Sequence, residues 1–244
     1  MLQIDSFCEN LLLRFPIEAG ILPGFKKLKE KEKIKLEKLT QHEIYQTIKE
    51  ARNSDLCVAI QFLSSDNKDL LDDIFEWAIE NEDKVEKWKL VGGTSQLASI
   101  LGIKEESTKE ELLKEAYDLT DWNSLRLKAK LLLTGKTQYQ DMGKVILQCC
   151  DNSNKIEAIT NYIYLFLNQA RTLNKRLIAK GFNQELHEFF WWENKEAQRI
   201  FNVHQKSLSY DCLRLNDSIL TISEAYLGKY KYNKLLNYKL DFQD

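Results

Sequence analysis

Residues that end or bend regular secondary structure are scarce in this sequence. It holds only nine glycines and two prolines in 244 residues. A β-rich architecture needs a turn every ten residues or so, and turns draw heavily on glycine and proline. The scarcity therefore favours long uninterrupted elements, which means helices. Because 43% of the residues are hydrophobic, the chain also has enough apolar side chains for a packed core.

The spacing of apolar residues supports the same conclusion. They recur at intervals of three and four, which is the period of an amphipathic helix. The pattern is strongest in four stretches, at 70–79, 139–150, 156–177 and 208–226. The stretch at 156–177 is expected to be a single long helix that ends before Gly181. Together these stretches predict an all-α protein.

Capping signals add further helix starts. Thr40 with Glu43, and Ser107 with Glu110, have the spacing of a capping box, in which two side chains satisfy amides of the first helical turn. Helices are also predicted at 108–119 and 122–133, so the elements before residue 150 are short and those after it long. We predict a single domain spanning residues 1–244, in which an array of short helices at about 1–150 packs on a C-terminal bundle of longer helices at about 151–244.

Charge and cysteine content restrict the class of protein. The 35 basic and 37 acidic residues give a net charge of −2, so no overall field attracts the chain to nucleic acid or an anionic membrane. No window contains 18 uncharged apolar residues, and the first twenty residues lack the basic start of a secretory signal. The five cysteines include the neighbours Cys149 and Cys150 but no Cys-x-x-Cys pair, which predicts reduced thiols in a cytoplasmic protein without a cofactor.

Arg199 and His204 are the first candidate site, in the sequence Arg-Ile-Phe-Asn-Val-His. The spacing resembles the R-x4-6-H motif of HEPN ribonucleases, small helical bundles that cleave RNA without a metal ion. The resemblance implies that these two residues from two protomers would meet at a dimer interface and act on the ribose hydroxyl and the phosphate. The alternative is a buried structural histidine, because five helical steps of about 100° place His204 about 140° from Arg199, on the apolar side.

An acidic cluster is the second candidate. Asp72, Asp73 and Glu76 look like the aspartate-rich Mg²⁺ motif of class I terpene synthases and prenyltransferases, and Asn216–Asp217 with Glu224 is similar to the second metal motif of that family. The resemblance implies carboxylates that hold Mg²⁺ together with a diphosphate. Helical spacing favours a different interpretation, since it places the three acids opposite the apolar stripe, where they would face water.

Two aromatic segments are candidate binding surfaces. Phe189, Phe190, Trp191 and Trp192 are consecutive, so on a helix they surround the axis and cannot share one core-facing stripe. They are either buried on all sides or a partner site, since Trp and Phe are typical hot-spot residues. Near the C-terminus, lysines alternate with tyrosines, which suits base stacking on RNA or single-stranded nucleic acid. This segment contains Lys229, Tyr230, Lys231, Tyr232 and Lys234.

The lysines and tyrosines of that last segment can equally pack as part of an ordinary helix. Because no catalytic constellation is well oriented, the sequence predicts a non-catalytic binding or regulatory protein that acts through macromolecular contacts. A protein partner is expected, with RNA or single-stranded nucleic acid as the other partner class and no membrane. The alternatives are the metal-independent ribonuclease and, third, the Mg²⁺-dependent isoprenoid diphosphate enzyme.

Overall fold

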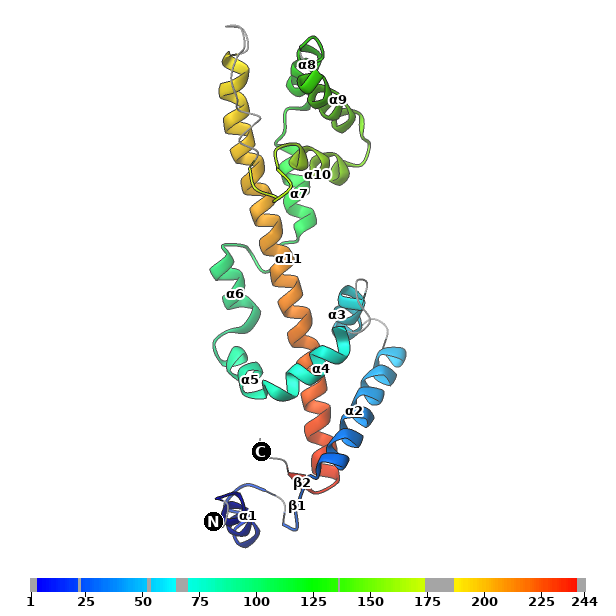
Figure 1. Ribbon diagram of the computed structural model, residues 1–244, viewed down its shortest axis with the longest axis vertical. Coiled ribbons are helices and arrows are strands. Elements are labelled where there is room, and N and C mark those ends of the chain that lie inside the picture. The colour runs from blue at the N-terminus through cyan, green and yellow to red at the C-terminus, as the bar shows by residue number, and fades with distance from the viewer. Residues whose placement is uncertain are drawn as a thin grey trace. The chain divides into compact units, whose positions relative to one another are not determined.

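The computed structural model describes residues 4–21, 23–51, 54–64, 70–135, 137–173 and 187–240. Within these ranges the side chains at 4–6, 9, 64, 138 and 187–194 are not described. The described residues form eleven helices and one two-stranded sheet (Figure 1). The predicted all-α fold is therefore confirmed. Among the described residues, none of the helices has both the length and the apolar character needed to cross a bilayer.

Contacts divide the chain into two compact units. Unit 1 comprises residues 1–93 and 215–244, and unit 2 comprises residues 94–214. The longest helix, α11 (His187–Leu236), contributes to both, because Arg214 belongs to unit 2 and Leu215 to unit 1. The single domain spanning 1–244 stays a prediction, since two clusters of contacts do not decide whether the units fold independently.

Unit 1 contains the first five helices, two short strands and the C-terminal part of α11. The elements are α1 (Ile4–Arg14), β1 (Lys26–Lys27), α2 (Glu30–Glu50), α3 (Asp55–Ser64), α4 (Leu70–Glu80), α5 (Glu82–Leu90) and β2 (Lys239–Leu240). The strands pair in parallel, with Lys26 opposite Lys239. This pairing joins the beginning of the chain to its end.

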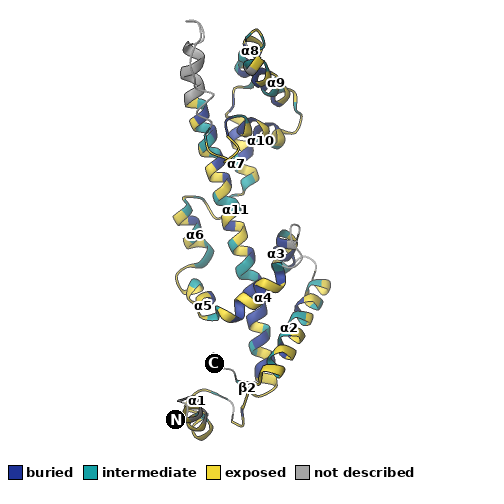
Figure 2. Cartoon of the chain, viewed as in Figure 1, coloured by how far each residue is buried: buried dark blue, intermediate teal, exposed yellow. Residues whose placement is uncertain are grey.

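The core of unit 1 forms where α2, α3, α4 and α5 pack on the C-terminal part of α11. Phe75 of α4 is fully buried and stacks on Tyr226 of α11, with 4.5 Å between ring centroids. Tyr230 stacks on Tyr226 one turn later. The buried side of α4 is the predicted apolar stripe, and the buried positions of α4 and α11 are dark blue in Figure 2. The helices of the first part of the chain thus pack on a long C-terminal helix, as predicted.

Unit 2 is a set of shorter helices with its own core. Its elements are α6 (Gly93–Leu101), α7 (Lys109–Asp118), α8 (Trp122–Leu133), α9 (Thr137–Asp151), α10 (Lys155–Leu165) and the first part of α11. Tyr162 and Phe166 are completely buried in this core, together with Ile200 of α11. The predicted helix at 122–133 has the observed bounds, and the predicted helix at 139–150 lies within α9.

Three sequence predictions about helix ends are wrong. Thr40 does not cap a helix but lies inside α2, where its buried hydroxyl donates to the carbonyl of Leu36, 2.8 Å away. The second capping box forms one residue later than predicted: Thr108 accepts from the amide of Glu111, whose carboxylate accepts from the Thr108 amide. A capping pattern specifies a pair of residue types, and the adjacent pair Thr108 and Glu111 has the same types and spacing one residue later.

The third difference is the long helix predicted at 156–177, because α10 ends at Leu165. Asn168 and Thr172 form a tight turn in which the Asn168 carboxamide bonds both the amide and the hydroxyl of Thr172. An asparagine side chain that bonds nearby backbone groups competes with helix formation, and here it ends the helix despite the apolar spacing. Gly181, the predicted cap, lies outside the described residues.

Candidate functional site

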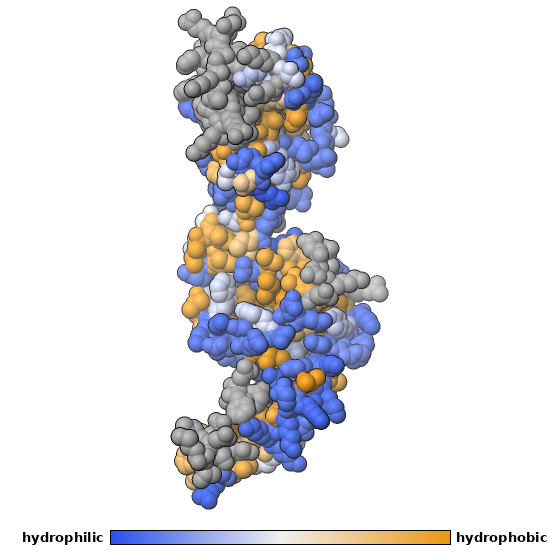
Figure 3. Space-filling model, viewed as in Figure 1, coloured by the Kyte–Doolittle hydropathy of each residue, from blue (hydrophilic) through white to orange (hydrophobic). Residues whose placement is uncertain are grey.

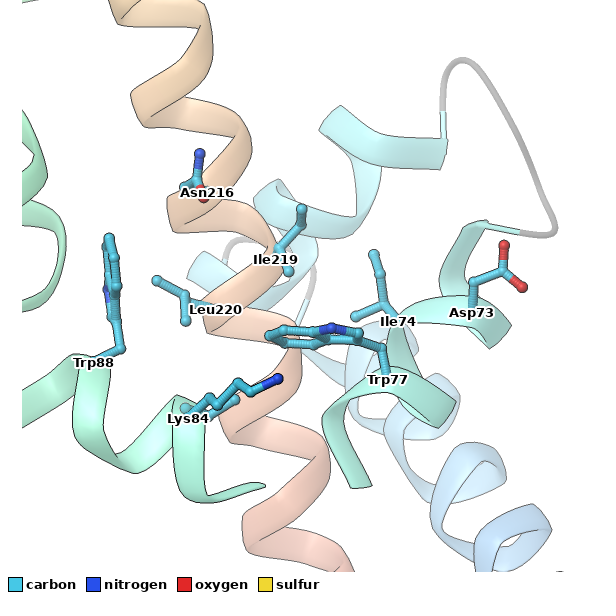
Figure 4. Close-up of a pocket in the computed structure, with 9 residues that line it drawn as sticks. Asp73, Ile74, Trp77, Lys84, Trp88, Asn216, Ile219 and Leu220 are labelled. Atoms are coloured by element: carbon cyan, nitrogen blue, oxygen red, sulfur yellow. The ribbon is translucent and has the colours of Figure 1, made fainter. Parts of the chain in front are cut away.

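An apolar groove in unit 1 lies between α4, α5 and α11 and has a volume of about 580 Å³. Its central walls are Trp77 of α4, Trp88 of α5 and Leu220 of α11. In the view of Figure 4, Leu220 lies between the two indole rings, with Ile219 beside it. The volume falls within the range of about 300 to 1,000 Å³ that is usual for sites that hold an organic ligand or a few side chains.

The amphipathic pattern of α4 explains why Trp77 lines this groove. Ile74 and Ala78 point into the core and are 5% and 0% exposed, whereas Trp77 lies at the edge of the same face and is 40% exposed. A tryptophan exposed to that degree keeps much of its large apolar surface in contact with water. Apolar residues reach the surface on the visible face of unit 1 in Figure 3 as well. The groove therefore offers apolar contact area that is not used in the fold.

The acidic residues of the predicted metal motif lie next to this groove. Asp72, Asp73 and Glu76 are exposed on α4, as their helical spacing predicts, and Asp73 also lines the groove. In Figure 4 the Asp73 carboxylate points away from the two indole rings. Among the described residues, no group of three or more His, Cys, Asp or Glu side chains is placed to hold a metal ion. Glu224, from the second predicted motif, instead forms an ion pair of 3.0 Å with Lys89.

Arg199, in unit 2, belongs to a partly buried network of hydrogen bonds. Its guanidinium donates to both carboxylate oxygens of Glu196, at 2.8 and 2.6 Å, and to the hydroxyl of Thr120 at 2.9 Å. The hydrogen bond to Glu196 raises the pKa of Arg199, and burial raises that of Tyr162, whose hydroxyl donates to the same carboxylate. Arg199 thus connects α11 to the end of α7.

His204 has different surroundings from Arg199. It is 5% exposed and lines a cavity of about 70 Å³ in unit 2, together with Arg171, Lys109 and Asp211. Burial, assisted by the positive charges of Arg171 and Lys109, lowers the pKa of His204 against the opposing effect of Asp211. Arg199 is not among the lining residues of that cavity. The ribonuclease pair stays a prediction, and the described contacts assign Arg199 to a structural ion pair.

Phe189, Phe190, Trp191 and Trp192 lie in α11, but their side chains are outside the described residues. Their role as a partner site stays a prediction.

The lysine and tyrosine segment near the C-terminus is helical, and its members differ in exposure. Tyr230 and Lys234 are buried, at 1% and 3% exposed, and the Lys234 ammonium lies over the Tyr230 ring, 5.2 Å from its centroid. Tyr232 is exposed, with Lys229 over its ring at 5.7 Å. A continuous stacking platform would need the rings on one accessible face, whereas here they point into and out of unit 1.

The other lysines of the segment bind acidic residues of the same unit. Lys231 forms an ion pair of 2.7 Å with Glu86 and a second one with Glu82, and the hydrogen bond from Lys231 lowers the pKa of Glu86. Lys229 lies 3.8 Å from Glu43. These contacts use the positive charges to join α11 to α2 and α5. They favour the interpretation of this segment as a packed helix, while nucleic-acid binding stays a prediction.

The five cysteines are free thiols. Burial raises the pKa of the Cys149 thiol to about 11, which keeps it protonated and poorly nucleophilic at neutral pH. Cys149 belongs to the core of unit 2, and Cys150 packs against that core. Both thus pack as small apolar side chains.

Comparison with models of known protein families, with curated proteins and with solved structures finds no match. The function is therefore argued from the site alone. Sequence analysis missed the groove, because Trp88 and Leu220 are 132 positions apart in the chain and only folding brings them to one surface. The single available signal was Trp77, a large aromatic residue at the edge of a stripe flanked by acids.

Proposed function

We propose that this chain is a non-catalytic binding protein and that the groove of unit 1 binds an amphipathic helix of a protein partner with basic residues on its polar face. The observation that carries the proposal is the groove itself, which is lined by the exposed Trp77 and by the apolar Ile219 and Leu220. Tryptophans in apolar pockets are the typical hot spots of protein interfaces. The chain is proposed to act in the cytoplasm, where free thiols such as these persist.

The shape of the groove suits a helix as the bound element. Its walls come from three helices, α4, α5 and α11, and a groove between helices is the usual receptor for the apolar face of an amphipathic helix. Such a ligand helix contributes apolar side chains at positions i, i+3 or i+4 and i+7. These would fill the space beside Leu220, between the rings of Trp77 and Trp88.

Acidic residues beside the groove favour a basic polar face on the partner, since the lysine that lines the groove, Lys84, donates to Asn81 at 2.6 Å. The exposed side of α4 carries four acidic residues, Asp72, Asp73, Glu76 and Glu80. Among the described residues, no lysine or arginine forms an ion pair with any of the four. Unneutralised charge at the edge of an interface steers a partner of opposite sign and disfavours one of like sign. Lysine or arginine on the partner helix would lie over this acidic row.

The test uses two synthetic 18-residue amphipathic helices with identical leucine positions, one with lysine and one with glutamate on the polar face. Binding to the full chain is measured by fluorescence anisotropy at about 0.15 M salt, where charges more than about 8 Å apart are largely screened. We expect the lysine peptide to bind and the glutamate peptide to bind at least tenfold more weakly. Equal binding of both peptides would contradict the proposed charge selection.

Two variants locate the binding site. Trp77→Ala should weaken the lysine peptide at least tenfold, which corresponds to about 1.4 kcal/mol. Tyr232→Ala is the matched control, because Tyr232 is an aromatic residue of unit 1 that is 53% exposed and does not line the groove. Circular dichroism of both variants establishes that they fold. If the two variants bind the peptide equally well, the groove is not the site.

A further inference from the structure

The cavity at His204 in unit 2 is separate from the groove and has the opposite chemistry. It lies between α7, α10, the turn that follows α10, and α11. Its lining residues with polar side chains are Lys109, Thr160, Tyr164, Arg171, His204, Ser207 and Asp211. Its volume of about 70 Å³ is several times what one water molecule requires, which is roughly 10 to 15 Å³ on this measure. The cavity can thus hold a small polar group.

Positive charge dominates this lining. Arg171 and Lys109 are near enough to act on His204, and Asp211 is the one acidic residue among those that line the cavity. Asp211 is already engaged, since its carboxylate lies 2.6 Å from the Lys109 ammonium. No carboxylate among the described residues forms an ion pair with Arg171. The Lys109–Asp211 pair is neutral overall, so the guanidinium of Arg171 supplies the net positive charge of the lining.

His204 is the most buried charged or titratable residue that lines the cavity. Nε2 of His204 is shielded from solvent and has no hydrogen-bond partner among the described residues. A neutral imidazole can carry its proton on that nitrogen and donate it to an oxygen acceptor. The hydroxyls of Thr160 and Ser207 already donate to the carbonyls of Ile156 and His204, at 2.6 and 2.9 Å.

The position of Arg171 is set by the turn rather than by a helix. The Arg171 backbone has φ of +55°, which few residues other than glycine adopt, and its amide donates to the Asn168 carbonyl at 2.9 Å. Leu167 and Leu173 close the turn as an isolated bridge. This turn brings the arginine to the edge of the cavity, where a longer α10 would have carried it away.

We propose that this cavity binds a phosphate group, held by Arg171 and Lys109 with His204 as a hydrogen-bond donor. An arginine fork matches two oxygens of a tetrahedral phosphate, and a lysine adds a point charge. The size of the cavity suits one phosphate group and not a whole nucleotide. The inference is independent of the partner helix proposed for unit 1.

The experiment titrates the full chain with inorganic phosphate, with chloride keeping the ionic strength constant, and follows the ring protons of His204 by NMR. We expect a saturable shift of the His204 signals and a rise in its pKa, because a bound anion stabilises the imidazolium. Phenyl phosphate forms the second arm: binding of inorganic phosphate alone indicates the free ion as ligand, and comparable binding of phenyl phosphate indicates an esterified phosphate. If neither compound shifts the signals saturably, the proposal is wrong.

Arg171→Gly is the decisive variant, since glycine adopts the observed φ without strain and removes the guanidinium. We expect it to weaken phosphate binding at least tenfold. The control is Lys130→Gln. Lys130 is an exposed residue of unit 2 that does not line the cavity, so this variant removes a positive charge elsewhere in the same unit. Glutamine is used because glycine would disturb α8. Equal loss in both variants would show non-specific attraction and overturn the proposal. Trp77→Ala should leave phosphate binding unchanged. A failure of the phosphate proposal can therefore be distinguished from a failure of the groove proposal.

Discussion

Unit 1 is assembled from both ends of the chain, whereas unit 2 is one continuous stretch. In unit 1, Asn233 donates to the hydroxyl of Thr40 and Lys239 binds Glu32, contacts that span about two hundred residues. In unit 2, the most extensive helix packing joins the sequence neighbours α8 and α9, and α10 packs to the same extent on its neighbour α9 and on α7. Bringing distant segments together costs loop-closure entropy that local packing avoids. The comparison indicates that unit 1 depends on the C-terminal segment and unit 2 does not.

The most severe test of this comparison is to end the chain after Arg214. The truncated protein lacks Tyr226 and Tyr230, which are buried in the core of unit 1. We expect amide hydrogen exchange to show lost protection throughout residues 1–93 and retained protection in residues 94–214. Full protection of both segments would mean that the long-range contacts of unit 1 contribute little to its stability.

A matched pair of core substitutions sharpens the comparison. Phe75 and Phe166 are both 0% exposed, one in each unit. Replacing either by alanine should lower the free energy of unfolding by about 3 to 5 kcal/mol, because the apolar contacts are lost and a cavity remains. Denaturant unfolding measures the decrease in the free energy of unfolding, and hydrogen exchange shows which residues lose protection. We expect each variant to loosen its own unit, and loosening of the same residues by both would refute the division.

A pair of glycines provides a test of intermediate size. In unit 2, a Cβ on Gly143 of α9 would lie 2.8 Å from the carbonyl oxygen of Ala129 in α8, whereas a Cβ on Gly228 in unit 1 would meet nothing within 4 Å. Gly143→Ala should cost about 1 to 3 kcal/mol by overpacking the contact between α8 and α9. Gly228→Ala should instead stabilise α11 by roughly 0.5 to 1 kcal/mol. Thermal unfolding of the two variants should therefore shift in opposite directions.

The smallest predicted effect is a pH dependence confined to unit 2. Burial lowers the pKa of His204 below its unfolded value of about 6.5. Below that pH the unfolded chain takes up a proton that the folded one resists, so stability contributed by neutral His204 is present above about pH 6.5 and is lost as pH falls. His204→Gln should flatten this part of the profile of unfolding free energy against pH. The control is His42→Gln, at an exposed histidine of unit 1. A flattened profile in both variants would contradict the assignment of this pH dependence to His204.

Helix-forming segments with a complete apolar stripe were predictable from sequence. The stripe at 70–79 lies in α4 and packs into the core, as expected. The predicted helix at 122–133 begins and ends where α8 does. Such predictions succeed because the period of three and four is a property of the helix itself. The predicted helix at 156–177 ends early because the Asn168 side chain accepts from the backbone amide of Thr172, a local alternative that apolar spacing does not register.

The candidate sites were less predictable than the helices. The sequence paired Arg199 with His204 by their spacing, yet the arginine binds Glu196 and Thr120 while the histidine borders a cavity with Arg171 and Lys109. Spacing along one helix says which direction a side chain takes but not which other segment faces it. The groove was missed for the same reason.

By itself the sequence determined that the chain is helical and where the helices with a strong apolar stripe lie, such as α4, α8 and α9, since these follow from local periodicity and the scarcity of turn residues. Only the tertiary structure decided that Trp77, Trp88 and Leu220 share one groove and that Arg171 and Lys109 face His204. Contacts between distant segments arise when apolar faces are buried together, and many pairings of such faces are compatible with the same local pattern.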